Sequence, residues 1–177
     1  MDEDLMAGAR RGDIDAFRDL VRRYQDRIFT VALRLTRNRA NAEDVAQQTF
    51  LQAWERRESY DRRWRVSTWL YRIVTNLCVD EYRRRARAAA ISPGGEPGPS
   101  AHPHAVIEAR ERRDRLNGAL GGLPRAQRTV LVLRYLDDLS YDEIGRVCGL
   151  PVNTVKSHLR RGKTALRRDL VDYWEDR

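Results

Sequence analysis

Six polar side chains in the later part of the chain have the types and spacing that suit contact with double-stranded DNA. They are Asn153, Lys156, Ser157, Arg160, Arg161 and Lys163. Amide, hydroxyl and guanidinium groups hydrogen-bond to base edges in the major groove, and cations contact the phosphates that border it. Residues 153–168 hold six basic side chains and no acidic one. This stretch therefore predicts a surface that binds duplex DNA.

The residues around this stretch predict two helices joined by a tight turn. Ser140 and Glu143 have the spacing of a capping box, and Gly149 ends the first helix because glycine adopts the left-handed conformation without strain. The second helix begins near Val152 or Asn153, and its apolar face is formed by Val155, Leu159, Gly162 and Leu166. This is the helix-turn-helix design. An ordinary hairpin with a solvated basic face is the alternative, but cap, turn glycine and one-sided charge together favour DNA binding.

A second cluster combines aromatic and basic side chains, which suits unpaired nucleic acid because every base offers a face for stacking. The loop expected at 58–66 carries Tyr60 and Trp64 among three arginines. Ser67 is expected to cap the helix that follows over residues 68–87, and this helix ends in Arg83, Arg84, Arg85 and Arg87. The alternative is that the tryptophans belong to the core, because most tryptophans at helical spacing are core residues.

The first sixty residues predict three helices and a surface for a partner. The expected helices cover residues 2–11, then run from the cap Asp13 to about Arg37, and then cover 42–57 after the cap Asn41. Leu51 falls away from the apolar face of the third helix, so it is predicted to be exposed. An exposed leucine in this setting indicates contact with another protein.

Residues 91–104 separate two helical regions, because they contain four prolines and three glycines and have no hydrophobic periodicity. We expect an all-α protein made of two small helical domains, at 1–88 and 107–177. A flexible Pro/Gly-rich linker at 89–106 joins them.

Charge and residue usage limit the classes of function. The 177 residues carry a formal charge of +8, and residues 1–60 are neutral, so the excess that would attract a polyanion lies in the later part. Cys78 and Cys148 are expected to be buried free thiols. His102 and His104 lack the cysteines or carboxylates of a metal site, so we predict no metal and no cofactor. We find no signal peptide and no transmembrane-length apolar run, and expect a cytoplasmic protein without membrane insertion.

Three segments of the chain resemble the extracytoplasmic-function (group 4) sigma factors of bacterial RNA polymerase. AEDVAQQTFLQAW at 42–54 resembles the helix that binds core polymerase, and STWLYRIVTNLCVDEYRRR at 67–85 resembles the promoter-melting helix. Residues 123–168 resemble the second DNA-binding domain of this family. Their order, with a Pro/Gly-rich linker between the second and the third, implies a sigma-2 domain followed by a sigma-4 domain that contains the helix-turn-helix.

The resemblance implies a protein that binds core RNA polymerase, directs it to specific promoters and promotes DNA melting. Lys156, Ser157 and Arg160 match positions that read the minus-thirty-five element, while Arg161 and Lys163 would contact phosphates. The set implied for the minus-ten element is Tyr60, Trp64, Trp69, Asn76, Arg83, Arg84 and Arg85. In that set the 58–66 loop and the Asn76 amide would hold a flipped base.

The resemblance also implies partners, and two positions of this chain differ from the family pattern. The polymerase-binding set is Asp44, Gln47, Gln48, Leu51 and Trp54, and an anti-sigma factor is an expected partner besides core polymerase and promoter DNA. Gly162 stands where the family often has alanine, which costs about 1 kcal/mol of helix propensity and permits closer packing. Asn153 replaces a common glycine, and we expect it to cap the recognition helix.

Two other classes of function compete with this interpretation. A stand-alone helix-turn-helix regulator would account for residues 139–170 but would leave residues 42–85 without a role. An enzyme is not expected, because the sequence contains no glycine-rich phosphate loop, nucleophile elbow or metal-ligand cluster.

Overall fold

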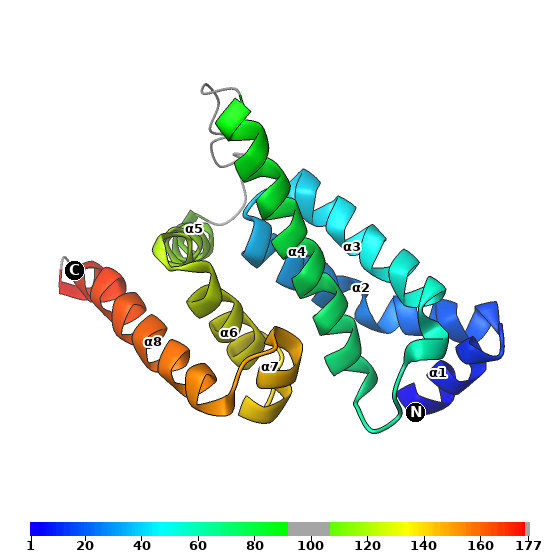
Figure 1. The fold of residues 1–177 in the computed structure, drawn as a ribbon. Helices are drawn as coiled ribbons and strands as arrows, with labels where there is room; N and C mark the ends of the chain where they lie inside the picture. Colours follow the sequence, from blue (N-terminus) through cyan, green and yellow to red (C-terminus); the bar gives the residue numbers. More distant parts are fainter. Residues whose placement is uncertain (92–106, 176–177) are drawn as a thin grey trace. The chain divides into compact units, whose positions relative to one another are not determined.

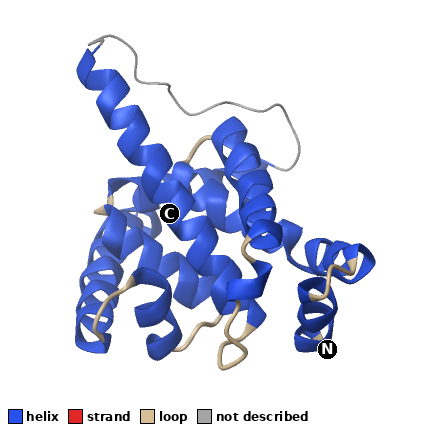
Figure 2. Ribbon diagram, turned by 45° about the vertical axis from the view of Figure 1, so that its right-hand side comes forward, coloured by secondary structure: helices blue, strands red, loops and turns tan. Residues whose placement is uncertain are grey.

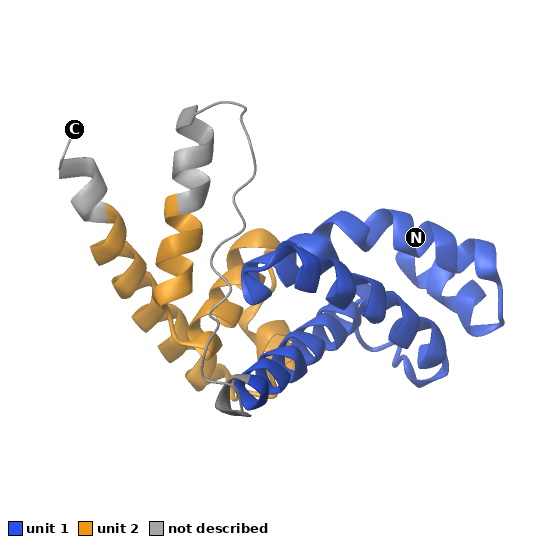
Figure 3. Cartoon of the chain, turned by 90° about the horizontal axis from the view of Figure 1, so that it is seen from above, with its two compact units in different colours: residues 1–96 blue, residues 97–177 orange. Residues whose placement is uncertain are grey.

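The computed structural model describes the backbone of residues 1–91 and 107–175, and the side chains of residues 1–88 and 115–170. Within these ranges the regular elements are all helical, as predicted (Figures 1 and 2). The chain divides into two compact units, Met1–Glu96 and Pro97–Arg177 (Figure 3). Helix α4 continues to Ile91, which is three residues into the stretch expected to form the linker. The rest of that linker, with His102 and His104, lies outside the described residues.

In its described part, residues 1–91, the first unit contains four α-helices and a short 3₁₀ helix. These are α1 (Asp2–Arg10), α2 (Ile14–Thr36), α3 (Arg39–Glu55), η1 (Arg57–Ser59) and α4 (Val66–Ile91). Helix α2 packs against α1, α3 and α4, and α3 also packs against α4. The core of this unit is formed by Leu20, Ile28, Val31, Ala32, Ala42, Val45, Ala53, Val66, Leu70, Tyr71 and Val74.

Two helix starts in this unit differ from the sequence prediction. Arg37 adopts a left-handed conformation with φ 58°, which turns the chain so early that Asn38 caps α3 and its side chain accepts the Asn41 amide. The prediction that Asn41 is the cap is therefore wrong. Helix α4 begins at Val66 rather than after a Ser67 cap, because Val66 is only 1% exposed and its burial brings the first turn into the core.

Helix α1 is held against α2 by a polar cluster around Asp2. Arg23 Nη1 lies 2.6 Å from Asp2 Oδ1, and the Tyr24 hydroxyl donates a hydrogen bond to the same carboxylate. Partial burial alone would raise the pKa of Asp2, but the hydrogen bonds from Tyr24 and Arg23 outweigh it and lower the pKa. Arg10 then donates to the Glu58 carbonyl at 3.3 Å, so that α1 supports η1.

The second unit contains α5 (Ile107–Gly122), α6 (Arg125–Leu136), α7 (Tyr141–Cys148) and α8 (Val152–Glu175). Helix α8 packs against each of the other three, mostly against α6 and α7. Arg128 connects α5 to α6, because its guanidinium donates to the carbonyls of Leu120, Gly121 and Leu123 at 2.8–3.1 Å. These bonds satisfy backbone oxygens that the end of α5 leaves without helical partners.

The turn between α7 and α8 has the expected signals and one that was not anticipated. Ser140 and Glu143 form the reciprocal capping box, and Gly149 is left-handed with φ 66°, as predicted. The Leu150 amide donates to the Gly145 carbonyl at 2.8 Å, and a Cβ on Gly145 would lie 2.7 Å from the Leu150 carbonyl oxygen. Gly145 therefore allows the chain to return closely across α7 before α8 begins.

Helix α8 begins at Val152, so Asn153 lies inside its first turn and does not cap it, contrary to the prediction. The Pro151 carbonyl instead accepts the amides of Thr154 and Val155. The close packing expected at Gly162 is confirmed, because a Cβ there would lie 2.7 Å from Leu131 Cδ1 of α6. Of the two free cysteines, Cys78 is buried as predicted, while Cys148 is only partly buried, and this burial raises its pKa to about 12.

We expect Gly145→Ala to destabilise the second unit by about 1–3 kcal/mol, because the new methyl group overlaps a backbone oxygen that has no free rotamer. Gly118→Ala is the matched control, since a Cβ on this exposed helical glycine meets nothing within 4 Å. It should stabilise by about 1 kcal/mol through helix propensity. Scanning calorimetry of the full chain measures both variants, and equal stabilisation by the two would contradict the steric role of Gly145.

Candidate nucleic-acid interface

The outer side of α8 carries all six side chains that the sequence predicts to contact duplex DNA. Each of Asn153, Lys156, Ser157, Arg160, Arg161 and Lys163 is exposed. The opposite side of the helix is buried, with Val155 0% and Leu159 5% exposed. At 3.6 residues per turn, Asn153 and Arg160 lie on one line parallel to the helix axis. Lys156 and Lys163 lie on one side of this line, and Ser157 and Arg161 lie on the other. The six groups therefore point away from the core together.

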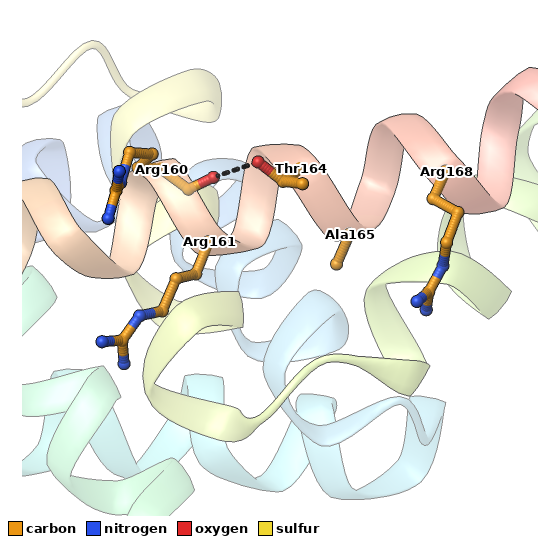
Figure 4. A pocket seen from close by; sticks show the side chains of 5 residues that line it. All are labelled: Arg160, Arg161, Thr164, Ala165 and Arg168. Carbon is orange, nitrogen blue, oxygen red and sulfur yellow. Dashed lines mark hydrogen bonds between the residues drawn. The ribbon is translucent and has the colours of Figure 1, made fainter.

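Sequence reasoning missed further outward residues on the same helix. Thr164 continues the line of Arg160 by one turn, and Arg168 continues the flank of Arg161 by two turns (Figure 4). Both are exposed, and neither is needed by the core. Their signal was available in the sequence, because positions four and seven residues apart share a helix face.

Helix α4 presents a second outward line, and Asn76 lies in its middle. Asn76 is exposed, and at helical spacing it shares its face with Trp69, Arg72 and Arg83. Arg72, which is also exposed, was not among the predicted residues. The other side of α4 is buried in the core of the unit. The arrangement places an amide, the edge of an indole and cations along one surface.

The aromatic residues of the 58–66 loop are packed more tightly than a set of stacking platforms would be. Tyr60 is only 4% exposed, its hydroxyl donates to the Trp64 carbonyl, and its ring meets Trp69 edge-on with centroids 5.5 Å apart. Burial raises the pKa of the Tyr60 hydroxyl. Tyr60 therefore supports the loop from beneath and offers no free face to a base in this conformation, because its ring fills the space under Trp69. Trp64 and Trp69 are half-buried, so part of each ring reaches the surface.

The charged residues of this region are held by local ion pairs. Arg63 donates to Asp61 through its backbone amide and through its guanidinium at 2.6–3.1 Å, and these hydrogen bonds lower the pKa of Asp61. Arg83 and Arg84 lie 3.7 Å from Asp80 and 2.7 Å from Glu81, respectively. The two arginines are well exposed, and exposed ion pairs contribute little to stability. They can therefore exchange these partners for phosphates at small cost. Arg85 is half-buried.

The predicted polymerase-binding residues share one face of α3. Asp44, Gln47, Gln48 and Leu51 are exposed, and Leu51 keeps 56% of its surface accessible, as predicted. Val45, Thr49 and Ala53 bury the opposite face. An apolar side chain surrounded by polar neighbours on an exposed face is typical of the centre of a protein-binding surface.

Trp54 lies at the edge of this α3 face and is held from two sides. Phe17 of α2 packs against its ring with centroids 5.1 Å apart, and the Arg57 guanidinium lies over the ring in a cation–π contact, 4.3 Å from its centroid. Arg57 also donates to the Trp54 carbonyl at 2.8 Å, which fastens η1 to the end of α3. The indole is therefore fixed in orientation while remaining partly exposed.

The described part of the chain offers no group of three or more histidine, cysteine, aspartate or glutamate residues that could hold a metal ion. Among the described helices, none has both the length and the apolar character needed to cross a membrane.

Comparison with known proteins identifies the family. The chain matches the family models described as Sigma-70 region 2 over residues 20–88 and Sigma-70, region 4 over residues 113–166. It is 36% identical over 174 residues to the ECF RNA polymerase sigma factor SigW of Bacillus subtilis, and the match covers 92% of this chain and 93% of that protein. The chain belongs to the extracytoplasmic-function sigma factors of RNA polymerase.

Other proteins similar to this sigma factor support the same family assignment. The RNA polymerase sigma-H factor of Pseudomonas aeruginosa is 32% identical over 180 residues, covering 96% of this chain and 93% of that protein. Among solved structures, CnrH in complex with the cytosolic domain of CnrY is 28% identical, with a TM-score of 0.75 and 97% of each chain covered. The sigma factor thus directs RNA polymerase to promoters in transcription initiation, and a stand-alone regulator is not favoured, because the family matches cover residues 20–88 as well as the helix-turn-helix region at 113–166.

We expect Leu51→Asp to weaken binding to core polymerase by more than tenfold while helicity stays unchanged, because Leu51 is exposed and contributes little to the fold. Tyr82→Asp is a matched control, since Tyr82 is a similarly exposed apolar residue of the same unit, on α4 (62%). Binding of labelled core polymerase without DNA measures the effect. If Leu51→Asp bound core polymerase as tightly as wild type, this face of α3 would not contact polymerase.

Proposed function

We propose that this sigma factor works through three surfaces with separate tasks. The α3 face around Leu51 binds core polymerase, the outer side of α8 reads the minus-thirty-five element, and the outward line of α4 captures the melted minus-ten element. The observation that carries the proposal is that all six predicted residues of α8 are exposed on one side of a helix whose other side is buried. A helix of this kind can enter the major groove without disturbing its own core.

On α8 the base-reading task falls to Arg160 and its neighbours Lys156 and Ser157. Arg160 and Lys156 lie one turn apart and are both exposed, so their cations can reach the N7 and O6 acceptors of guanines in neighbouring base pairs. Ser157 lies beside them and can bond to either kind of base edge. Arg161 and Lys163 lie on opposite sides of Arg160, which suits contact with the phosphates at the borders of the groove.

We expect Arg160→Ala to cost about 1–3 kcal/mol of specific binding and to relax preference at one base position. Lys163→Ala is the matched control, because it removes one cation from the same helix but at a phosphate-contacting position. It should weaken binding to all sequences alike. Holoenzyme reconstituted from core polymerase and the full chain is titrated with upstream-element duplexes altered one base pair at a time. A uniform loss for Arg160→Ala across these duplexes would refute base reading by this residue.

On α4 the melting task falls to Asn76 and the rings beside it. Capture of an unpaired base must return the few kcal/mol that unstacking costs, through hydrogen bonds to the base edge and through stacking. Asn76 has an exposed amide that can supply the hydrogen bonds, and Trp64 and Trp69 each offer part of a ring. Tyr60 has a supporting task in this arrangement, since it is buried beneath Trp69. Arg83, Arg84 and Arg85 continue the cationic surface toward the backbone of the strand.

We expect Asn76→Ala to leave closed-promoter binding intact and to reduce open-complex formation, because only the captured state uses the amide. Gln25→Ala is the matched control, an exposed amide on α2 of the same unit outside the three surfaces. Permanganate footprinting on duplex promoter DNA measures opening, and a template with a pre-melted bubble should restore much of the lost reactivity. If wild type and Asn76→Ala react equally on the duplex template, Asn76 has no part in melting.

The remaining expectations concern partners and location. CnrH was solved with the cytosolic domain of CnrY, and we propose that a regulatory protein of the anti-sigma type likewise covers surfaces of this chain. We further propose that the protein acts in the cytoplasm, where polymerase and promoters are found. Its contribution is binding and DNA opening, and it performs no chemical step of its own.

A further inference from the structure

Helix α1 borders the 58–66 loop, although the family match to region 2 begins only at residue 20. It contacts η1 and α4, the elements in which the loop begins and ends (Figure 1). Arg10 is the last residue of α1, and its Nη2 donates a hydrogen bond to the Glu58 carbonyl at 3.3 Å. This bond ties the end of α1 to the residue at which the loop begins.

Contacts with α2, and not with the loop, fix the position of α1. Met6 and Ala9 are fully buried on the inner side of α1. At the start of the helix, Asp2 pairs with Arg23 of α2 at 2.6 Å and accepts a hydrogen bond from the Tyr24 hydroxyl. Helix α2 in turn packs against α3 and α4, the other helices of this unit. Since α1 is anchored to the core of the unit, it can hold the loop in place.

The loop carries Trp64, one of the rings proposed to stack on an unpaired base. The Trp64 amide donates to the Asp61 carbonyl at 3.0 Å, and its carbonyl accepts the Tyr60 hydroxyl, so these bonds shape the loop locally. The Tyr60 ring meets Trp69 and thereby joins the loop to α4, while Arg10 joins its start to α1. A loop held from two sides loses less conformational entropy when it captures a base, because most of that ordering precedes the arrival of the strand.

We propose that α1 is a positioning element for promoter melting. Arg10 fixes the start of the 58–66 loop in the conformation that captures an unpaired base, and the pairing of Asp2 with Arg23 keeps α1 where Arg10 can do so. The proposal rests on the proposed melting role of the loop and of α4, and it adds three residues that no sequence motif assigned. These residues are positioning residues, because they act through the backbone of Glu58 and do not touch DNA or polymerase.

Hydrogen exchange of the full chain measures the effect on the loop itself. Arg10→Met removes the donor but keeps an unbranched side chain, whereas Arg10→Lys keeps a cation that can donate to the same carbonyl. The amides of Ser59, Tyr60 and Trp64 each donate within the loop region and report on its order. We expect them to exchange several-fold faster in Arg10→Met and near the wild-type rate in Arg10→Lys, with unchanged rates in α2 and α3 of both variants.

Open-complex formation by reconstituted holoenzyme measures the effect on melting. On duplex promoter DNA, Arg10→Met and Arg23→Ala should lower the rate of opening by about fivefold, the factor that corresponds to one lost hydrogen bond. Arg10→Lys should retain most of the wild-type rate, and a template with a pre-melted bubble should restore much of the loss. Binding to core polymerase and closed-promoter binding should be unchanged in all three variants, because α1 acts only through the loop.

Arg22→Ala is the matched control for Arg23→Ala. The two arginines are adjacent on α2, but Arg22 pairs at 3.3 Å with Asp19 of its own helix, whereas Arg23 pairs with α1. Arg22→Ala should therefore open promoters at the wild-type rate. Equal losses in these two variants, wild-type opening by Arg10→Met, or weaker binding of Arg10→Met to core polymerase would each overturn the proposal.

The melting role itself is tested separately by Asn76→Ala. If Asn76→Ala opens duplex promoters like wild type while Arg10→Met does not, the amide has no part in melting but the positioning by α1 stands. If Asn76→Ala is impaired and Arg10→Met opens normally, melting by α4 stands and the role of α1 is refuted. The failure of one proposal is therefore distinguishable from the failure of the other.

Discussion

The burial of one side of α8 against α6 and α7 is the interaction on which the proposed DNA-reading surface depends. Val155 and Leu159 are nearly inaccessible, and Gly162 brings α6 so close that even a methyl group would meet Leu131. With the inner side held this tightly, the helix cannot rotate about its axis, and the outer side keeps its polar groups in one orientation. Base recognition needs donors that are already fixed, because the entropic cost of ordering a side chain reduces the free energy gained from its hydrogen bonds.

In the first unit, aromatic and polar contacts as well as apolar burial fix the orientation of α4 and of the 58–66 loop. Leu70 and Val74 fix the inner side of α4, while Tyr60 holds Trp69 and the loop from beneath. The Asp2 cluster fastens α1, and α1 in turn supports η1 through Arg10. The family match to region 2 begins at residue 20, so this support comes from a helix outside the matched region. The support of the 58–66 loop therefore includes contacts that the matched region does not contain.

The parts of the fold that local chemistry determines could be predicted from the sequence. The capping box at Ser140, the left-handed Gly149 and the polar outer side of α8 each follow from residues within one or two turns. The errors arose where distant residues decide. Burial of Val66 in the core moves the start of α4 before Ser67. A contact with Trp69 also buries the ring of Tyr60, which the sequence did not indicate, and the contact of Tyr60 with DNA stays a prediction.

The proposed surfaces on α3 and α8 would bind through different physical forces, and this difference gives order to their tasks. The proposed polymerase-binding face of α3 offers Leu51 and a fixed indole, whose burial would be driven by the hydrophobic effect and would release no counterions. The proposed DNA-reading side of α8 offers cations, so its affinity for the duplex would fall steeply as salt rises. Binding to polymerase can therefore persist while contact with DNA forms and breaks. A subunit that stays on its enzyme while the enzyme samples DNA needs this combination, because release from a wrong sequence then does not require release from the polymerase.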